Sequence, residues 1–382
     1  MRFGGMISTV DIKSMSREEC RSFFESAGEP GYRADQVLEW LYRHRVSSYD
    51  DMTNLPRLLR AKLAEVAPLR SPEVLARSVS PGGDTTKYLM GLVDGNAVEA
   101  VLMEHDYGLS LCVSSQVGCQ MGCAFCASGL GGLVRDLTCG EMIDQMLAAN
   151  DDAAERFDTA RISSVVVMGS GEPLLNYDSV IKFVRLANWD RGFGIGARHI
   201  TISTCGIVPG IMRLAGEGIP LTLSVSLHAS DDATRSSIMK VNAAYPISTL
   251  VKACSQYAEI TGRRVTYEYA LMAGVNDSPA HAERLAGMLR GTLCHVNLIP
   301  LNPVPETPYV RPASRVVEAF AGALQSRGIE ATIRRQMGFV MFRLACLAVL
   351  YWFLYRVCAC LVSDAQASSA ACREEEEEDT DG

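Results

Sequence analysis

The chain has 382 residues, 48% hydrophobic and 21% charged, which is typical of a globular protein with a substantial core in one large domain plus an accessory module, or in two domains. Thirteen cysteines, spread along the chain without a secretory or transit leader, argue against a disulfide framework and favour a reduced, cytoplasmic setting. The net charge of −8 does not exclude a nucleic-acid partner, because residues 339–382 alone carry three arginines against eight acidic residues. Residues 1–338 are therefore nearly balanced.

A small helical module is predicted for residues 1–70. Ser16 followed by Glu18 and Glu19 is typical of a helix start, and residues 34–44 carry apolar side chains at helical spacing. The module is rich in basic residues, namely Arg33, Arg43, Arg45, Arg57, Arg60 and Lys62. Such residues form either a solvated helix face or a surface that docks on RNA.

Residues 71–105 are predicted to form short strands and turns, and strands alternate with helices from about residue 109. The expected strands are Leu109–Val113, Ser164–Met168, His199–Thr204, Leu221–Ser226, Val265–Ala270, Val296–Pro300 and Ile329–Arg334. The expected helices include Gly140–Ala149, Val180–Asn188, Ile247–Thr261 and Ala280–Leu289. This alternation predicts a parallel sheet with fewer than the eight units of a closed barrel. We therefore expect an α/β fold with an open, partial (β/α) barrel over residues 106–338.

Three cysteines follow the first strand of the barrel at C-x3-C-x2-C spacing. They are Cys119, Cys123 and Cys126, with Phe125 just before the last. Thiolates are the usual ligands of iron–sulfur clusters, and three of them leave one iron of a four-iron cluster free to bind a small molecule. The alternative, three structural thiols that only pack in the core, is disfavoured by the clustering. The spacing resembles that of the radical S-adenosylmethionine (SAM) enzymes, whose SAM binds the open iron.

Polar residues or glycines stand at the ends of several predicted strands. Gly169-Ser170-Gly171-Glu172 follows one strand, Ser203 ends the next, Ser226-Leu227-His228 ends another, and Asn302 follows a later one. Each of these alone is typical of an ordinary turn. Because the carboxyl ends of parallel strands meet at one edge of a sheet, the set predicts one shared site.

Eight ordered motifs resemble the RlmN/Cfr family of radical SAM RNA methyltransferases. The matching runs are GYRADQVLEWLY, AVEAVLM, LCVSSQVGCQMGCAFCASG, MGSGEPLLNYDSV, HITISTCGIVPGI, SVSLHA, YEYALMAGVND and NLIPLNP. They cover roughly residues 15–338 in the family's order. The resemblance implies a (β/α)6-type radical SAM barrel with a small N-terminal helical accessory domain.

The resemblance also implies a role for individual residues. Cys119, Cys123 and Cys126 would hold a [4Fe-4S] cluster. Glu99 would accept a proton, and Cys112 would resolve the covalent intermediate through a transient disulfide. The SAM site would be lined by Gly171, Glu172, Ser203, Ser226, Leu227, His228 and Asn302. On the residues alone, Glu99 is a surface carboxylate and Cys112 a buried strand residue.

The implied reaction adds a methyl group to C2 of an adenine in 23S rRNA and in tRNA. It consumes two SAM molecules per turnover: the first methylates a C-terminal cysteine, and the second is cleaved reductively to give the radical that activates this methyl group. The implied partners are the two RNAs and an electron donor such as flavodoxin or ferredoxin. We expect a monomer without a stable membrane partner.

The C-terminal residues 339–382 depart from the family pattern after Gly338. The methyl-carrying cysteine of the family corresponds to Ala345, and Cys346 lies one residue later without the Gly-Gln-Leu that should follow. This tail is a membrane-associated segment, a helix packed on the barrel, or the product of a shifted reading frame or an unspliced intron. Its uninterrupted apolar stretch, 344–355, would make a helix of roughly 18 Å, which is short of a bilayer core of about 30 Å.

Two alternatives to adenine-C2 methylation stay open. The shared motifs do not distinguish methylation at C2 from methylation at C8. The altered tail also allows an RNA-binding homologue that keeps the cluster and the SAM site but does not turn over. A third class, a membrane-anchored enzyme of the same chemistry, would fractionate with membranes.

Overall fold

The computed structural model describes residues 10–70, 73–156 and 161–334. The chain begins with three helices, α1 (Arg17–Ser26), α2 (Tyr32–Tyr42) and α3 (Arg57–Val66). Ser16 caps α1: its hydroxyl accepts the Glu19 N–H at 3.1 Å, and the Glu19 carboxylate accepts the Ser16 N–H at 2.7 Å. This reciprocal cap confirms the predicted helix start and contributes about 1 kcal/mol.

Four antiparallel strands follow the helices. They are β1 (Glu73–Val79), β2 (Thr85–Gly91), β3 (Ala97–His105) and β4 (Gly108–Val113). Each pairs with the next, and Val101 of β3 lies opposite Cys112 of β4. Because β4 also pairs in parallel with β7 (Ile162–Val167), it joins this antiparallel extension to the barrel.

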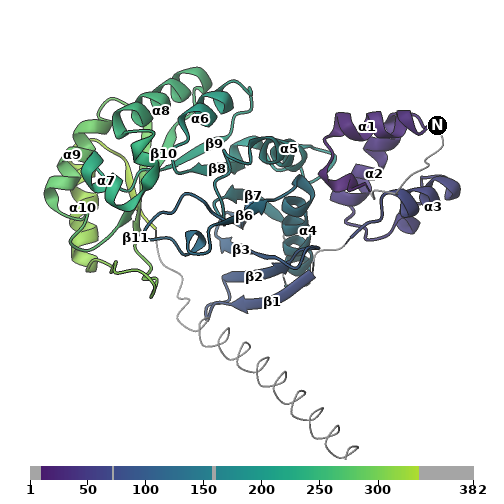
Figure 1. Ribbon diagram of the computed structural model, residues 1–382, viewed down its shortest axis with the longest axis horizontal. Coiled ribbons are helices and arrows are strands. Elements are labelled where there is room, and N and C mark those ends of the chain that lie inside the picture. Colours follow the sequence, from purple (N-terminus) through teal and green to yellow (C-terminus); the bar gives the residue numbers. More distant parts are fainter. Residues whose placement is uncertain (1–9, 71–72, 157–160, 335–382) are drawn as a thin grey trace, which may run out of the picture. The chain divides into compact units, whose positions relative to one another are not determined.

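The barrel strands β4, β7, β8 (Ile200–Thr204), β9 (Thr222–Ser226), β10 (Val265–Leu271), β11 (Cys294–Pro300) and β12 (Ala331–Ile333) are all parallel (Figure 1). Within the described residues the strand order of this sheet is β1-β2-β3-β4-β7-β8-β9-β10-β11-β12, so it is open at both edges. The predicted partial, open barrel is confirmed.

Seven helices alternate with these strands in the described part of the chain. They are α4 (Cys139–Arg156), α5 (Tyr177–Asn188), α6 (Val208–Ala215), α7 (Asp232–Ile238), α8 (Ile247–Thr261), α9 (Pro279–Leu289) and α10 (Ser314–Gln325). The sequence analysis did not predict α6, α7 or α10. Short helices such as α7 carry too few apolar positions to give a periodic pattern in the sequence.

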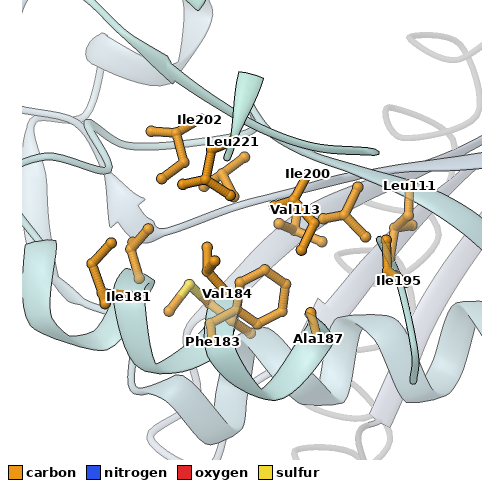
Figure 2. Close-up of a cluster of buried hydrophobic side chains, with 14 of the residues drawn as sticks. Leu111, Val113, Ile181, Phe183, Val184, Ala187, Ile195, Ile200, Ile202 and Leu221 are labelled. Carbon is orange, nitrogen blue, oxygen red and sulfur yellow. The ribbon is translucent and has the colours of Figure 1, made fainter. Parts of the chain in front are cut away.

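The barrel strands present an apolar face to the helices and a polar face to the opposite side. Figure 2 shows Leu111, Val113, Ile200 and Ile202 packed against Phe183, Val184 and Ala187 of α5. Successive side chains of a strand point to opposite faces. The intervening residues, which include Cys112, Ser203, Ser224, Glu268 and Asn297, therefore lie on the face away from the helices.

None of the helices within residues 10–334 is long and apolar enough to cross a membrane. The hydrophobic tail 339–382, with Cys346, lies outside the described residues. The three readings of that tail therefore stay predictions.

Candidate functional site

The three cysteines of the C-x3-C-x2-C motif lie in a loop between two short strands. β5 (Gln116–Gly118) and β6 (Leu133–Asp136) pair as an antiparallel hairpin, and residues 119–132 connect them. The Cys119 N–H donates to the Gly132 carbonyl at 2.9 Å, and the Cys126 N–H donates to the Cys123 carbonyl at 3.1 Å. The backbone thus holds the thiol-bearing loop on the hairpin, which follows the C-terminal end of β4.

Gly118 is required at the start of this loop for two reasons. Its φ of +74° is left-handed, and a Cβ at this position would lie 2.0 Å from the Gly132 carbonyl oxygen. The clash cannot be relieved by rotating a side chain, because the Cβ position is fixed by the backbone of residue 118 and the oxygen belongs to the backbone of Gly132. Only glycine fits here.

We expect Gly118→Ala to distort the loop and to lower the iron content of the reconstituted protein by more than half. Gly131→Ala is the matched control, because Gly131 lies in the same loop and a Cβ there meets open space. Iron per chain, measured after anaerobic reconstitution, should drop only in Gly118→Ala. Equal iron in the two variants would contradict the role given to the hairpin.

The three thiols are free and partly exposed. Burial, together with the neighbouring Cys126 and Cys119 thiols, raises the pKa of Cys123 to about 12. Among the residues that the structure describes, no three His, Cys, Asp or Glu side chains converge as they would on a single metal ion. A four-iron cluster does not need such convergence, since each thiolate binds a different iron. The set therefore fits a cationic cluster that stabilises thiolates, and binding would release protons.

The loop Gly169–Pro173 lies against the start of the cysteine hairpin. Gly171 has a φ of +107°, and a Cβ there would meet the Gln116 side chain and backbone at 2.6–2.8 Å. The Gln116 side-chain oxygen accepts the Glu172 N–H at 2.8 Å, while its amide donates to Asp136 at 2.6 Å. Gln116, which the sequence analysis missed, thus joins this loop to both strands of the hairpin.

Glu172 is buried, with 2% of its surface exposed. Its carboxylate accepts the Leu174 N–H at 3.0 Å and the Cys205 N–H at 2.7 Å. Burial raises its pKa, and these hydrogen bonds oppose that effect. The Thr204 hydroxyl and the Cys205 thiol also donate to this carboxylate, so an ammonium group would bind here by replacing or sharing one of these side-chain donors.

His228 lies at the end of β9 in a strained conformation, with a φ of +56°. Its Nδ1 accepts the Ala270 N–H at 2.9 Å, and the Asn276 amide donates to its carbonyl at 2.7 Å. Because Nδ1 is an acceptor, the neutral ring carries its proton on Nε2. Phe125 meets this ring edge to face at 4.9 Å between centroids, and so brings the cysteine loop to the ends of the strands.

Burial, together with the nearby Arg235, lowers the pKa of His228 from its ordinary 6.5 to about 3. Between these values the unfolded chain binds a proton that the folded protein does not. The contribution of His228 to the free energy of unfolding is therefore most favourable above pH 6.5, and it decreases as the pH falls toward 3.

We expect His228→Asn to remove this dependence, since asparagine tolerates a positive φ. Urea unfolding of the cluster-free protein at several pH values tests it. Relative to the variant, the wild type should lose up to roughly 1.4 kcal/mol per pH unit below pH 6.5. Parallel profiles would contradict the neutral, buried state of this ring.

The other residues predicted for a SAM site end the neighbouring strands or follow them. Ser203 and Leu227 are buried, Ser226 is partly buried, and Asn302 is exposed two residues after β11. Ser203 lies opposite Ser224 of β9. The structure therefore brings the loop with Glu172 and the ends of β8 and β9 together, and it places Asn302 at the same edge of the sheet without a described hydrogen bond.

Glu99 and Cys112 share the polar face of the sheet. Cys112 lies opposite Val101, and Glu99 is two residues before Val101, so both side chains project from the face opposite Leu111 and Val113. Glu99 is half exposed and forms an ion pair with Lys87. Burial raises the pKa of Cys112 to about 11, whereas the Arg334 guanidinium lowers it.

Glu268 is a second buried carboxylate, on the same face, that the sequence analysis did not identify. It accepts hydrogen bonds from the Ser224 hydroxyl and the Asn297 amide, both at 2.7 Å. Its backbone carbonyl accepts the N–H groups of Leu227 and His228. The signal in the sequence was a glutamate at an inward position of a strand whose alternate residues are apolar, in VTYEYAL.

Two family models and several relatives match this chain. Residues 10–69 match the "Ribosomal RNA large subunit methyltransferase N-terminal domain", and residues 113–286 match the "Radical SAM superfamily". A protein of Desulforamulus reducens named "Probable dual-specificity RNA methyltransferase RlmN" is 48% identical over 329 residues, which cover 86% of this chain and 93% of that protein. A protein of the same name from Symbiobacterium thermophilum is 51% identical over 328 residues, 86% of this chain and 88% of that protein.

A solved structure is also similar over most of the described chain. It is that of a radical SAM methyltransferase from Sphaerobacter thermophilus, with a TM-score of 0.82 and 46% sequence identity. The match covers 86% of this chain and 96% of that one. The fold and the sequence therefore agree on the same group of proteins.

Proposed function

We propose, since this chain belongs to the RlmN family of radical SAM RNA methyltransferases, that it methylates C2 of an adenine in 23S rRNA and in tRNA. The observation that carries the proposal is the contact between Phe125 and His228, which sets the three-thiol loop beside the strand ends with Glu172, Ser203 and Ser226. A metal centre that cleaves SAM needs both parts of this site at one edge of the sheet.

The cofactors are a [4Fe-4S] cluster held by Cys119, Cys123 and Cys126, and SAM. When bound, the cluster supplies the electron that cleaves SAM and yields a 5′-deoxyadenosyl radical. Glu172 would accept a hydrogen bond from the ammonium group of SAM in place of one of its present side-chain donors, and Gly171 would let the backbone approach SAM closely. Ser203, Ser226, Leu227, His228 and Asn302 line the remainder of the SAM site.

Glu99 and Cys112 act on the RNA after the carbon–carbon bond has formed. Glu99 takes the proton from the ring carbon that receives the methyl group. Cys112 would attack the sulfur that links protein and RNA, so that an S–S bond forms while the bond from that sulfur to the methyl carbon breaks and this carbon takes up a proton. The unpaired electron left by radical addition would return to the oxidised cluster, and the disulfide must then be reduced. The raised pKa keeps Cys112 protonated at neutral pH, so a base has to take its proton. The nearby Arg334 guanidinium stabilises the thiolate that forms.

The proposed reaction also needs a cysteine that carries the methyl group. Cys346 is the candidate, and it lies outside the described residues. Two SAM molecules are then used in each turnover, one to methylate this cysteine and one to generate the radical. The similarity to methyltransferases over 86% of the chain favours turnover over the alternative of a binding protein without activity.

Anaerobic incubation with SAM, a reductant and 23S rRNA fragments or tRNA tests the proposal. Mass spectrometry of the digested RNA should show adenosine methylated at C2. Methylation at C8 would overturn the regiochemistry, and SAM cleavage without RNA methylation would establish the binding alternative. Sequencing the transcript through codon 338 decides whether the tail is in frame.

The N-terminal helices are proposed to dock on the RNA. Tyr32 is 56% exposed, and the Arg33 guanidinium lies 5.0 Å from its ring centroid, an arrangement that suits stacking on a base. Arg57 and Lys62 of α3 are also exposed and can bind phosphates.

We expect the double variant Arg57→Glu/Lys62→Glu to bind tRNA more weakly than the wild type. The slope of log affinity against log salt should become less steep by about one for each phosphate that the protein no longer neutralises. Lys252→Glu/Arg290→Glu, which makes the same charge change on exposed residues of the barrel helices, is the control. Equal salt slopes for all three proteins would remove the docking role.

An electron donor such as flavodoxin or ferredoxin is proposed as the reductant, and the enzyme is proposed to act as a monomer in the cytoplasm. Gel filtration with light scattering tests the oligomeric state, and reduction of the cluster by either protein tests the donor.

A further inference from the structure

Arg235 of α7 has no exposed surface, although arginine is rarely buried. Its five hydrogen bonds to described residues all go to neutral oxygen atoms. Nε donates to the Leu227 carbonyl at 3.1 Å. The two terminal nitrogens donate to the carbonyls of Cys205 (2.7 Å), Ser226 (3.3 Å) and Tyr245 (3.2 Å), and to the Asn242 side chain (3.1 Å).

Three of these acceptors belong to the ends of β8 and β9, whose relative position determines the shape of the proposed SAM site. Cys205 follows β8, and Ser226 and Leu227 end β9. Arginine is suited to this task, because its planar fork presents five donors in fixed directions. A lysine offers three donors at a single point and cannot reach all of these carbonyls together.

The hydrogen bonds continue from Arg235 to Glu172. The Cys205 carbonyl accepts from Arg235, and the Cys205 N–H donates to the Glu172 carboxylate at 2.7 Å. The orientation of the Glu172 side chain therefore depends on where Arg235 holds residue 205. The same helix also reaches the cysteine loop, because the Ile238 carbonyl at its end accepts the Ala124 N–H at 2.9 Å.

Packing alone does not require a charge at this position. The neighbouring Ile238, Met239 and Val241 form a small apolar cluster, in which an aliphatic side chain would fit well. Burying a cation without an anionic partner costs free energy. The guanidinium donates hydrogen bonds to backbone carbonyl groups that converge at the ends of two strands. Buried carbonyl groups need such donors.

We propose that Arg235 is a positioning residue that holds the ends of β8 and β9, and through Cys205 the Glu172 carboxylate, in the arrangement that binds SAM. The proposal rests on the proposed function of this edge as the SAM site. It assigns to α7 a part in cofactor binding, although no atom of Arg235 needs to touch SAM.

Equilibrium dialysis of SAM against anaerobically reconstituted protein tests this assignment. The variants are Arg235→Lys and Arg235→Met, and the control is Arg284→Met. Arg284 donates to Asp231 at 3.1 Å, at the cap of the same helix, but its described bond does not involve a strand end. Iron content and melting temperature are measured for each protein.

We expect Arg235→Lys to bind SAM about 10- to 100-fold more weakly, as the loss of one or two charged hydrogen bonds would cause, while it keeps its iron. Arg235→Met should be weaker still, and Arg284→Met should match the wild type. In methylation assays the KM for SAM should rise more than kcat falls.

A folded Arg235→Lys protein that binds SAM like the wild type, with only a lower melting temperature, would overturn the proposal in favour of a purely structural role. If Arg235→Lys does not fold, SAM binding is measured for Asn242→Ala instead, because this variant removes only one of the hydrogen-bond acceptors of Arg235. A severalfold weaker SAM affinity would then support the proposal, and an unchanged affinity would overturn it. Failure of the wild type itself to bind SAM would instead refute the proposed function.

Discussion

Cys123→Ala is expected to remove the iron–sulfur cluster and to reduce RNA methylation to the level seen without enzyme. Cys123 is the middle one of the three proposed ligands, and an alanine would leave two thiols for a cluster proposed to bind three. The measurement is iron and sulfide per chain after anaerobic reconstitution, together with the visible absorption of the cluster.

Cys294→Ala is the matched control for this substitution. Cys294 is also free and partly exposed, but it begins β11 and so lies at the opposite edge of the sheet from the cysteine loop. Its replacement should leave the iron content unchanged. A Cys123→Ala protein with a full complement of iron would show that the cluster is held elsewhere.

Glu99→Gln is expected to slow RNA methylation by about 10²- to 10⁴-fold, the usual contribution of a general base. Glutamine keeps the shape of the side chain but does not take the proton from the ring carbon. Reductive cleavage of SAM should continue, because the strand ends that bind SAM are unchanged. The measurement is the ratio of methionine released to RNA methylated.

Glu104→Gln provides the comparison for Glu99→Gln on the same strand. Glu104 is exposed and lies opposite Leu109, five residues from Glu99, so it projects from the other face of the sheet. Both variants lose one negative charge, but only Glu99→Gln should uncouple SAM cleavage from methylation. A normal ratio in Glu99→Gln would mean that another group accepts the proton.

The parallel barrel was predictable from the sequence because its strands and helices are long and regularly spaced. The strand VTYEYAL alternates between two sets of residues, and the structure buries Val265, Tyr267, Tyr269 and Leu271. Figure 2 shows the corresponding residues Val113 and Ile202 of other strands beside α5. The residues at the strand ends were predictable as a group for the same reason, since parallel strands deliver their carboxyl ends to one edge.

Residues that join distant segments were not predictable in this way. The Gln116 side chain bonds a loop more than fifty residues away, and Arg235 bonds strand ends that precede it by eight to thirty residues. A single sequence carries no periodic signal for such contacts. Roles for Glu99 and Cys112 came only from family resemblance, because a strand glutamate and a strand cysteine have no distinguishing pattern of their own.

The site therefore has two parts with different support. The cysteine loop, Glu172 and the ends of β8 and β9 are linked by contacts from Phe125, Gln116 and Arg235. Glu99 and Cys112 share one face of the sheet near Arg334. Cys346, the candidate for the methyl-carrying cysteine, lies outside the described residues.

The central claim is that both parts act together on an adenine of RNA. It is tested most directly by anaerobic incubation of the full chain with tRNA and SAM that carries a deuterated methyl group, followed by mass spectrometry of the nucleosides. We predict 2-methyladenosine that has lost one deuterium, because the methyl group passes through a radical on carbon. A product that retains all three deuterium atoms, or cleaved SAM with unmodified adenosine, would contradict the claim.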